Sequence, residues 1–306
     1  MRALASPASL KGVLSARAAA ALLAEGLRAA GAQAEELPIA DGGEGTGEVL
    51  GARVVDRFSV PDAFGRARDA PIRAVADGTA LVEAAEVIPL DPARLDPLAA
   101  SSRGLGELIA QVEADRLVVC LGGTATMDGG AGLREVLHEL PAATTVLCDT
   151  LATLLDAPRL FAPQKGATPE HVELFERRFA AMDELAPFAV LPGSGAAGGL
   201  GAALASLGAE LVPGAREVLR RVDFRASVRR ADLVITGEGK VDETTETGKA
   251  PGEALRACRE EGVRCVVFGG RVEIDLADAE VVALSGDPAL AAGDLRELGR
   301  RLGGLD

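Results

Sequence analysis

The residues best suited to chemistry are four lysines in a chain that otherwise uses arginine for positive charge. Lysine and arginine together number 32, and the lysines are Lys11, Lys165, Lys240 and Lys249. Each is adjacent to a glycine in the sequence. A lysine beside glycine in a loop is typical of a point charge that contacts phosphate. Survival by chance in an arginine-biased genome is the alternative, and we favour a functional role for at least two of the four.

A glycine-rich stretch between Leu117 and Leu137 predicts an anion site. An apolar run that indicates a strand ends in Gly-Gly-Thr-Ala-Thr-Met-Asp-Gly-Gly, and a helical pattern follows. Glycines let the backbone approach a phosphate, and the free N–H groups of a helix N-terminus point at it. We therefore expect the loop from Gly122 to Gly130 to bind phosphate, with candidate residues Gly122, Gly123, Thr124, Asp128 and Gly129.

Carboxylates occupy loop positions elsewhere in the chain. Asp41 and Glu44 flank Gly42-Gly43, which fits either a turn with solvated acids or a carboxylate pair for a metal or a hydroxyl. Asp149 follows the apolar strand Thr145–Leu147, where open α/β sheets bind ligands. Glu238 and Asp242 flank Lys240.

Lysines, glycine loops and carboxylates together suit phosphoryl transfer, in which cations spread the phosphoryl charge, carboxylates hold Mg²⁺ and one acid orients the acceptor hydroxyl. The two common nucleotide motifs are absent from the sequence. The segment ending at Gly248-Lys249 has Glu243 and Ala250 where a P-loop needs Gly and Ser or Thr. No G-x-G-x-x-G follows a first strand, which disfavours a dinucleotide oxidoreductase.

The elements that must position these groups alternate between strand and helix over most of the chain. Ser15 is a predicted cap for a helix over Ala16–Ala30, and Leu233–Thr236 reads as a buried strand. Between these, Ile72–Ala76 and Thr79–Glu83 flank Asp77-Gly78, a hairpin signal that indicates antiparallel strands. The glycine-rich segment Leu191–Leu204 permits close approach of either a ligand or a neighbouring helix.

Composition excludes several classes of function. The net charge of −14 argues against binding to nucleic acid or an anionic membrane. The four cysteines show no C-x-x-C spacing and read as reduced, buried thiols, and two isolated histidines make a zinc site or a Ser-His-Asp triad improbable. The first residues do not resemble a signal peptide and no apolar run reaches membrane-spanning length, so we expect a cytoplasmic protein.

Seven segments, in order, resemble motifs of the bacterial glycerate kinase type-1 family, over nearly the whole chain. They are Ser9–Ala16, Pro38–Thr46, Ser101–Ile109, Leu121–Gly132, APQKGATPE, PGSGAAGGLGAAL and ADLVITGEGKVD. The resemblance implies phosphorylation of D-glycerate, or a similar small hydroxy acid, by ATP with Mg²⁺. It also implies two α/β domains, one flavodoxin-like with a mostly parallel sheet and one smaller with antiparallel strands, and a site between them.

The predicted domains are residues 1–48 plus part of 100–306, and an inserted domain of 49–99, with part of 155–225 as a possible addition. Asp41, Asp149, Lys11 and Lys165 are the expected catalytic residues, and Asp41 and Asp149 the expected metal ligands. The residues expected to bind substrate or phosphate, besides those of the Gly122–Gly130 loop, are Ser9, Glu44, Glu238, Lys240, Asp242 and Lys249.

The chain departs from the family pattern at three polar positions. Ala8 stands where the family usually has Asp, and Met127 and Ala152 stand where it has Asn. An alternative prediction is therefore a homologue that binds a small anionic ligand with little or no turnover. Asp41 and Asp149 are retained, so a carboxylate for a metal or a base is present in either case.

Overall fold

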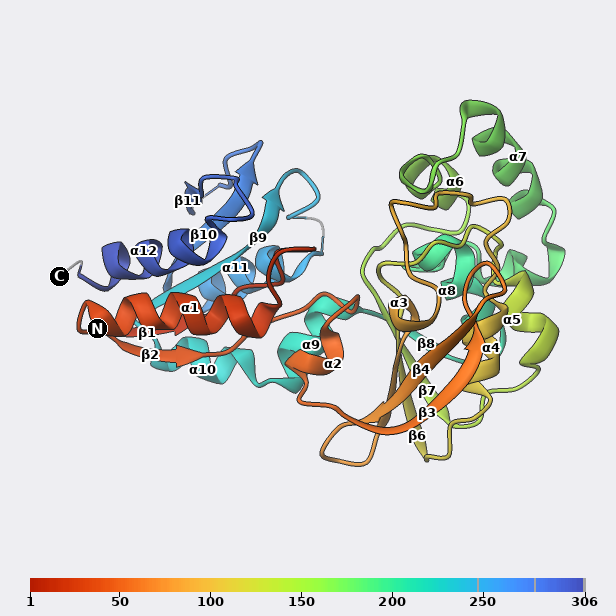
Figure 1. The fold of residues 1–306 in the computed structure, drawn as a ribbon, viewed down its shortest axis with the longest axis horizontal. Coiled ribbons are helices and arrows are strands. Elements are labelled where there is room, and N and C mark those ends of the chain that lie inside the picture. The colour runs from red at the N-terminus through yellow and green to blue at the C-terminus, as the bar shows by residue number, and fades with distance from the viewer. Residues whose placement is uncertain (247, 278, 305–306) are drawn as a thin grey trace. The chain divides into compact units, whose positions relative to one another are not determined.

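The computed structural model describes residues 1–246, 248–277 and 279–304 (Figure 1). The chain divides into two compact units. Unit 1 consists of Met1–Asp41, Glu48–Leu50 and Ala215–Asp306, and unit 2 of Gly42–Gly47 and Gly51–Gly214. Among the described residues, no helix is both long and apolar enough to cross a membrane.

Unit 1 is built on a five-stranded, fully parallel sheet in the order β11-β10-β9-β1-β2. Its strands are β1 (Arg2–Ala5), β2 (Gln33–Glu36), β9 (Leu233–Val241), β10 (Arg264–Val272) and β11 (Glu280–Ala283). When the five strands are numbered in chain order, their order in the sheet is 2-1-3-4-5, as in flavodoxin. The chain first adds β2 on one side of β1 and then adds β9, β10 and β11 on the other side, so the strand order reverses between β1 and β9. The predicted flavodoxin-like sheet is confirmed.

Helices cover both faces of this sheet because successive side chains of each strand point to opposite sides. Ala3, Ala5 and Phe268 pack towards one face, and Leu4 and Val267 towards the other. The first face carries α1 (Ala16–Ala29) and α12 (Ala291–Gly303), and the second carries α9 (Gly214–Arg221), α10 (Phe224–Arg230) and α11 (Ala250–Glu261). The predicted cap is confirmed, since the Ser15 side chain accepts a hydrogen bond from Ala18 N at 3.3 Å.

Unit 2 is built on a six-stranded mixed sheet in the order β3-β4-β5-β6-β7-β8. Its strands are β3 (Arg53–Pro61), β4 (Ala67–Ala74), β5 (Ala80–Glu83), β6 (Arg116–Cys120), β7 (Ala143–Cys148) and β8 (Glu210–Pro213). The β3–β4 and β4–β5 pairs are antiparallel and the others parallel, so the predicted hairpin is present. Because β5 pairs with β6, the antiparallel strands extend the sheet that carries the glycine-rich loop.

The two compact units differ from the domain limits proposed from sequence, since residues 51–214 lie together in unit 2. The limits of residues 1–48 plus part of 100–306, and of 49–99 with part of 155–225 as a possible addition, stay a prediction about domains. The helices of unit 2 pack mainly through one core that joins the sheet to α4, α5 and α8. They are α3 (Ala84–Val87), α4 (Arg103–Ile109), α5 (Ala131–Val136), α6 (Ala157–Phe161), α7 (Pro169–Ala180) and α8 (Ala196–Ser206). Short 3₁₀ turns lie at Pro163–Lys165 and Asp183–Phe188. Helix α2 (Thr46–Val49) contains residues of both units.

Two local features differ from the sequence-based expectation. Strand β9 continues through Gly-Glu-Gly to Val241 instead of ending at Thr236, because β10 is long enough to pair with it as far as Val272. Helix α8 contains three residues in left-handed conformation, Ala197, Gly198 and Gly199. A Cβ on Gly198 would lie 2.1 Å from Thr126 O, so glycine here permits close approach of another backbone segment.

Candidate functional site

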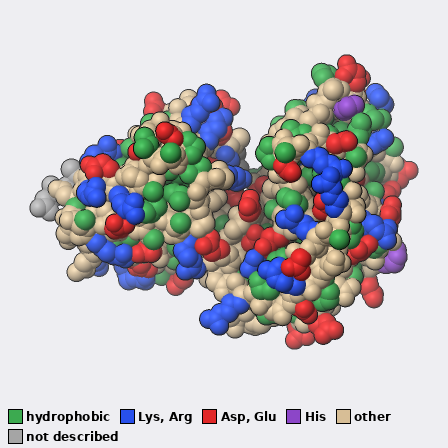
Figure 2. Space-filling view, viewed as in Figure 1, with side chains coloured by type: hydrophobic (Ala, Val, Ile, Leu, Met, Phe, Trp, Pro, Cys, Tyr) green, Lys and Arg blue, Asp and Glu red, His purple; other side chains and the backbone are tan. Residues whose placement is uncertain are grey.

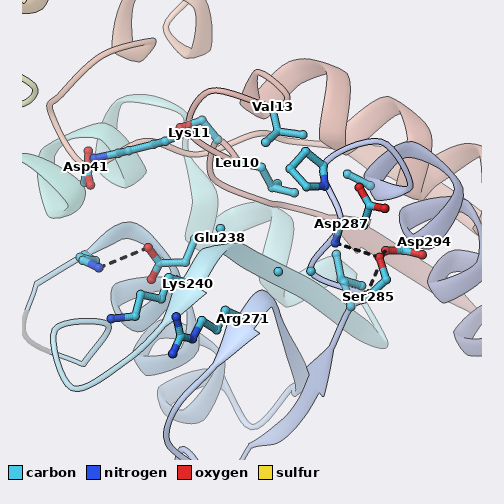
Figure 3. A pocket seen from close by; sticks show the side chains of 18 residues that line it. Leu10, Lys11, Val13, Asp41, Glu238, Lys240, Arg271, Ser285, Asp287 and Asp294 are labelled. Carbon is cyan, nitrogen blue, oxygen red and sulfur yellow. Dashed lines mark hydrogen bonds and ion pairs between the residues drawn. The ribbon is translucent and has the colours of Figure 1, made fainter. Parts of the chain in front are cut away.

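Unit 1 contains a pocket of about 630 Å³, called here the large pocket (Figure 3). It lies at the carboxyl ends of β1, β9, β10 and β11, where open parallel sheets bind ligands. Three of the four lysines line it. Its lining residues include Ser9, Leu10, Lys11, Val13, Asp41, Glu238, Lys240, Lys249, Ser285, Pro288, Ala291 and Asp294.

One end of the large pocket is charged. Lys249 Nζ lies 3.4 Å from Glu238 Oε2 and 3.7 Å from an Asp242 carboxylate oxygen, and Lys240 Nζ lies 3.1 Å from the other Asp242 oxygen. The Lys11 side chain extends towards Asp41 (Figure 3). Cations and carboxylates therefore alternate across this end, an arrangement that can accept an anion together with a metal ion.

The surroundings shift the pKa values of Glu238 and Asp242 in opposite directions. Desolvation raises the pKa of Glu238, opposed by Lys249 and a hydrogen bond from Thr245 and reinforced by the negative charge of Asp41. Desolvation also acts to raise the pKa of Asp242, but hydrogen bonds from Thr244 and the nearby Lys240 and Lys249 bring it down to about 2. Asp242 is thus ionised at every physiological pH.

The other end of the large pocket is more apolar. Leu10 and Val13 lie there (Figure 3), and Pro288 and Ala291 also line the large pocket. The loop before α12 is held in place because Ser285 N and Oγ donate hydrogen bonds to Asp294 at 3.0 and 2.5 Å. Sequence reasoning did not single out this loop, since Ser285 and Asp294 lie far from every glycine–lysine motif.

Unit 2 contains a second, smaller pocket of about 80 Å³, called here the small pocket. It lies at the carboxyl ends of β6 and β7. Its lining residues are Leu90, Leu121, Gly123, Thr124, Asp149, Thr150, Phe161, Gln164, Lys165 and Ala197. All four lysines of the chain therefore line one of the two pockets.

The lysine of the small pocket is buried, with only 4% of its surface exposed. Lys165 Nζ donates a hydrogen bond to Thr126 O at 2.8 Å. Desolvation lowers the pKa of Lys165 to about 8, while the charges of Asp149 and Asp128 act to raise it. The ammonium form still dominates at neutral pH, so the pocket keeps a positive charge with little water around it.

Thr124 provides a second polar group in the small pocket. It is 3% exposed, and its Oγ1 has no hydrogen-bond partner among the described residues. The backbone around it is fixed, because Leu90 N donates to Gly123 O at 2.8 Å and Ala125 N donates to Ile88 O at 3.0 Å. A buried hydroxyl without a partner costs about 1–3 kcal/mol, which a bound ligand would recover.

Asp128 organises its own loop. Its carboxylate accepts hydrogen bonds from Ser102 N and Oγ at 2.8 and 2.7 Å, and from Gly130 N and Gly132 N at 3.0 and 3.2 Å. The N–H groups at the start of α5, which the sequence assigned to phosphate, thus already contact an anion that belongs to the chain. Asp128 and Gly129 lie outside the lining of the small pocket, whereas Gly123 and Thr124 line it.

The Asp-Gly-Gly-Glu-Gly segment is held by a residue that sequence reasoning passed over. Glu83, which is 4% exposed at the end of β5, accepts hydrogen bonds from Gly45 N at 2.9 Å and Gly47 N at 2.6 Å. Burial raises its pKa, and the two N–H groups oppose this shift. Glu44 itself is exposed. A Cβ on Gly122 would lie 2.6 Å from Gly43 Cα and 2.9 Å from Asp149 Oδ2, so this segment passes close to Asp149.

The three positions that depart from the family pattern do not line either pocket. Met127 is fully buried in a cluster with Leu154, Phe175 and Phe179, so its side chain serves the core under α7. Ala8 is partly buried against the unit 1 core, and its N–H donates to Gly237 O at 2.8 Å.

A resident metal cage is absent from the described part of the chain, which holds no group of three or more His, Cys, Asp or Glu side chains suited to a metal ion. The two expected metal ligands belong to different units, Asp41 to unit 1 and Asp149 to unit 2. Mg²⁺ commonly takes one or two carboxylates and completes its shell with phosphates and water. The donor set therefore fits an ion that arrives with a nucleotide.

Comparison with known proteins gives a consistent result. The model of the glycerate kinase family matches residues 3–139 and 138–287. The chain is 34% identical to the glycerate kinase of Bacillus subtilis (strain 168), over 90% of this chain and 86% of that protein. It is also 34% identical to the glycerate 2-kinase of Escherichia coli (strain K12), over 82% and 80% of the two chains.

A solved structure extends this similarity to the fold. The crystal structure of a protein proposed to be glycerate kinase 2 of Salmonella typhimurium LT2 superposes with a TM-score of 0.77 at 29% identity. The match covers 99% of this chain and 97% of the other. The sequence motifs, the two sheets and these matches agree: this chain belongs to the glycerate kinase family.

Proposed function

We propose that this protein transfers a phosphoryl group from ATP to glycerate or a similar small hydroxy acid. The observation that carries the proposal is the position of the lysines, all four of which line a pocket at the carboxyl ends of parallel strands. The names of its relatives, glycerate kinase and glycerate 2-kinase, support the class of acceptor.

The large pocket is the proposed nucleotide site. Its volume of about 630 Å³ lies in the usual range for pockets that bind cofactor-sized ligands. Its apolar end can pack against a base, and Lys11, Lys240 and Lys249 can contact phosphates at its charged end. No tryptophan or tyrosine exists in the chain to stack on the base, so aliphatic side chains supply that contact.

Mg²⁺ would be held by Asp41 together with the phosphates of the nucleotide, where it neutralises charge on the transferred group. Asp41 and Glu238 both line the large pocket, and the negative charge of Asp41 acts to raise the pKa of Glu238. Ser9 and Glu238 line the same pocket and remain candidates for substrate or phosphate contacts. Asp242 lies outside the lining but beside Lys240 and Lys249, whose positions it fixes.

The proposed transfer forms a bond between an acceptor hydroxyl oxygen and the γ-phosphorus of ATP. The bond between that phosphorus and the β–γ bridging oxygen breaks, and ADP leaves with the electron pair. Asp149 is the proposed acceptor of the hydroxyl proton, and the lysines stabilise charge on the phosphoryl oxygens. The products are a phosphoglycerate and ADP.

A coupled assay of ADP release with D-glycerate and Mg-ATP tests this function. We expect turnover of about 1–100 s⁻¹, the usual range for kinases. The Lys11→Ala variant should lose at least about tenfold in kcat/KM for ATP, because a charge-assisted contact to phosphate contributes about 1.5–3 kcal/mol. Unchanged kinetics in this variant would contradict the role of Lys11. Binding of ATP without ADP release would instead favour a ligand-binding homologue with little or no turnover.

A further inference from the structure

The small pocket holds two polar groups that the fold leaves ready for a ligand. Thr124 Oγ1 is buried, lines the pocket and has no hydrogen-bond partner among the described residues. Within the described part of the chain, Lys165 Nζ donates one hydrogen bond, to Thr126 O, although an ammonium group has three N–H donors. A donor hydroxyl and a buried cation on one small cavity favour an anion with several oxygen acceptors.

The size of the small pocket restricts which anion can enter. A cavity needs a volume of about 10–15 Å³ to hold one water molecule. About 80 Å³ therefore admits roughly five to eight non-hydrogen atoms, close to the size of a three-carbon hydroxy acid. A nucleotide is far larger than this space.

Charge then orients the ligand within the pocket. Asp149 lines the same cavity and would repel a carboxylate, but it can accept a hydrogen bond from a hydroxyl. The nearby Asp128 is already satisfied by Ser102 and by N–H groups of its own loop. The favourable arrangement thus places a carboxylate against Thr124 and Lys165 and hydroxyls against Asp149.

We propose that the small pocket of unit 2 is the binding subsite for the hydroxy-acid acceptor, with Thr124 and Lys165 holding its carboxylate and Asp149 facing its hydroxyls. This assignment rests on the proposed function for the identity of the acid. It gives Thr124 a role in determining the affinity for the acceptor. It also assigns acceptor binding to residues of the small pocket, whereas the lysines of the large pocket are left to bind the nucleotide.

The experiment compares Thr124→Val with Thr144→Val. Thr144 is also buried, but its hydroxyl donates to Ala142 O and it does not line the small pocket, so it controls for the cost of losing a buried hydroxyl. Calorimetric titration with D-glycerate, with and without a non-hydrolysable ATP analogue, gives the dissociation constants. We expect Thr124→Val to weaken glycerate binding about 10–100-fold, the worth of a buried hydrogen bond to a charged group. Thr144→Val should leave glycerate affinity unchanged, and ATP affinity should persist in both.

Conservative and rim variants complete the test. Thr124→Ser, which keeps the hydroxyl, should recover most of the affinity that Thr124→Val loses. If Thr124→Val does not fold, Gln164→Ala at the exposed rim should weaken glycerate binding a few-fold. Loss of ATP affinity in place of glycerate affinity, or wild-type protein that binds no glycerate in either titration, would overturn the subsite. Wild-type protein that binds glycerate through Thr124 but releases no ADP would contradict the proposed kinase activity while supporting the subsite.

Discussion

In the large pocket, Lys249 lies within 3.7 Å of two carboxylates, whereas in the small pocket Lys165 donates to a backbone carbonyl at 2.8 Å. Two lysines of the large pocket, Lys240 and Lys249, are at least partly exposed and form ion pairs with Glu238, Asp242 and Glu273. Lys165 is buried, and the charges of Asp149 and Asp128 act to raise its pKa. Lysine side chains thus lie in two different electrostatic environments in this protein.

The ligands that we propose for the two pockets would account for this difference. Exposed ion pairs are screened and contribute about 0–1 kcal/mol, so their members can exchange partners at low cost when a phosphate and a metal ion enter. A buried ammonium has already lost its water, so an anion that reaches it gains a strong interaction without a further desolvation cost on that side.

The visible faces of both units also mix positive and negative side chains, with no large basic area (Figure 2).

The largest expected effect separates the two kinds of lysine. Lys165→Met should lower kcat/KM for glycerate by about 10²–10³-fold, because loss of a buried charge partner typically costs 2–5 kcal/mol. The matched variant Lys240→Met should instead raise KM for ATP about tenfold, because it loses a proposed charge-assisted contact to phosphate, and should change KM for glycerate at most about threefold. Steady-state kinetics with each substrate varied in turn measures both. A larger loss in Lys240→Met than in Lys165→Met would reverse the comparison.

A pH profile sharpens the comparison further. Because burial lowers the pKa of Lys165 to about 8, the pocket loses its positive charge as pH rises through that value. We expect kcat/KM for glycerate to be level between pH 6 and 7.5 and to fall about tenfold by pH 9, one unit above this pKa. The remaining activity of Lys165→Met should show no such fall. A wild-type profile that stays level to pH 9 would contradict a role for this ammonium.

A smaller effect is expected from the loop beside the small pocket. Glu83→Gln keeps the shape of the side chain but replaces one of two accepting oxygens with an N–H₂ group, which faces Gly45 N or Gly47 N. The expected cost is about 1–3 kcal/mol, or a fall in Tm of about 2–8 °C. Calorimetry gives the stability, and the rise in KM for glycerate should be a few-fold. An unchanged Tm would show that Glu83 does not hold this segment.

Residue type and immediate neighbours were sufficient to predict several features. A lysine next to glycine marks a loop in which a cation can approach a ligand, and all four such lysines line pockets. The alternation of strands and helices and the Asp77-Gly78 turn likewise predicted the parallel sheet and the hairpin.

Other features depend on partners far away in the sequence. Glu83 ends a strand and precedes alanines, and only the fold shows that it accepts from two glycines more than 35 residues earlier. The burial of Met127 depends on α7, which follows one strand, β7, and two α-helices, α5 and α6, later in the chain. Occupation of the α5 N-terminus by Asp128 depends on the conformation of the loop, which the order of residues alone does not determine.

The pairing of β1 with β9 has a consequence for synthesis of the protein. Ala3 pairs with Leu233, so β1, an interior strand of the parallel sheet, must wait for its second partner about 230 residues away, while unit 2 is nearly continuous in sequence. At about 5–20 residues per second, the ribosome needs roughly 10–50 s to supply that partner. Unit 2 can complete its sheet in this interval. Translation speed and chaperone contact with the waiting N-terminal segment therefore bear on the yield of folded enzyme.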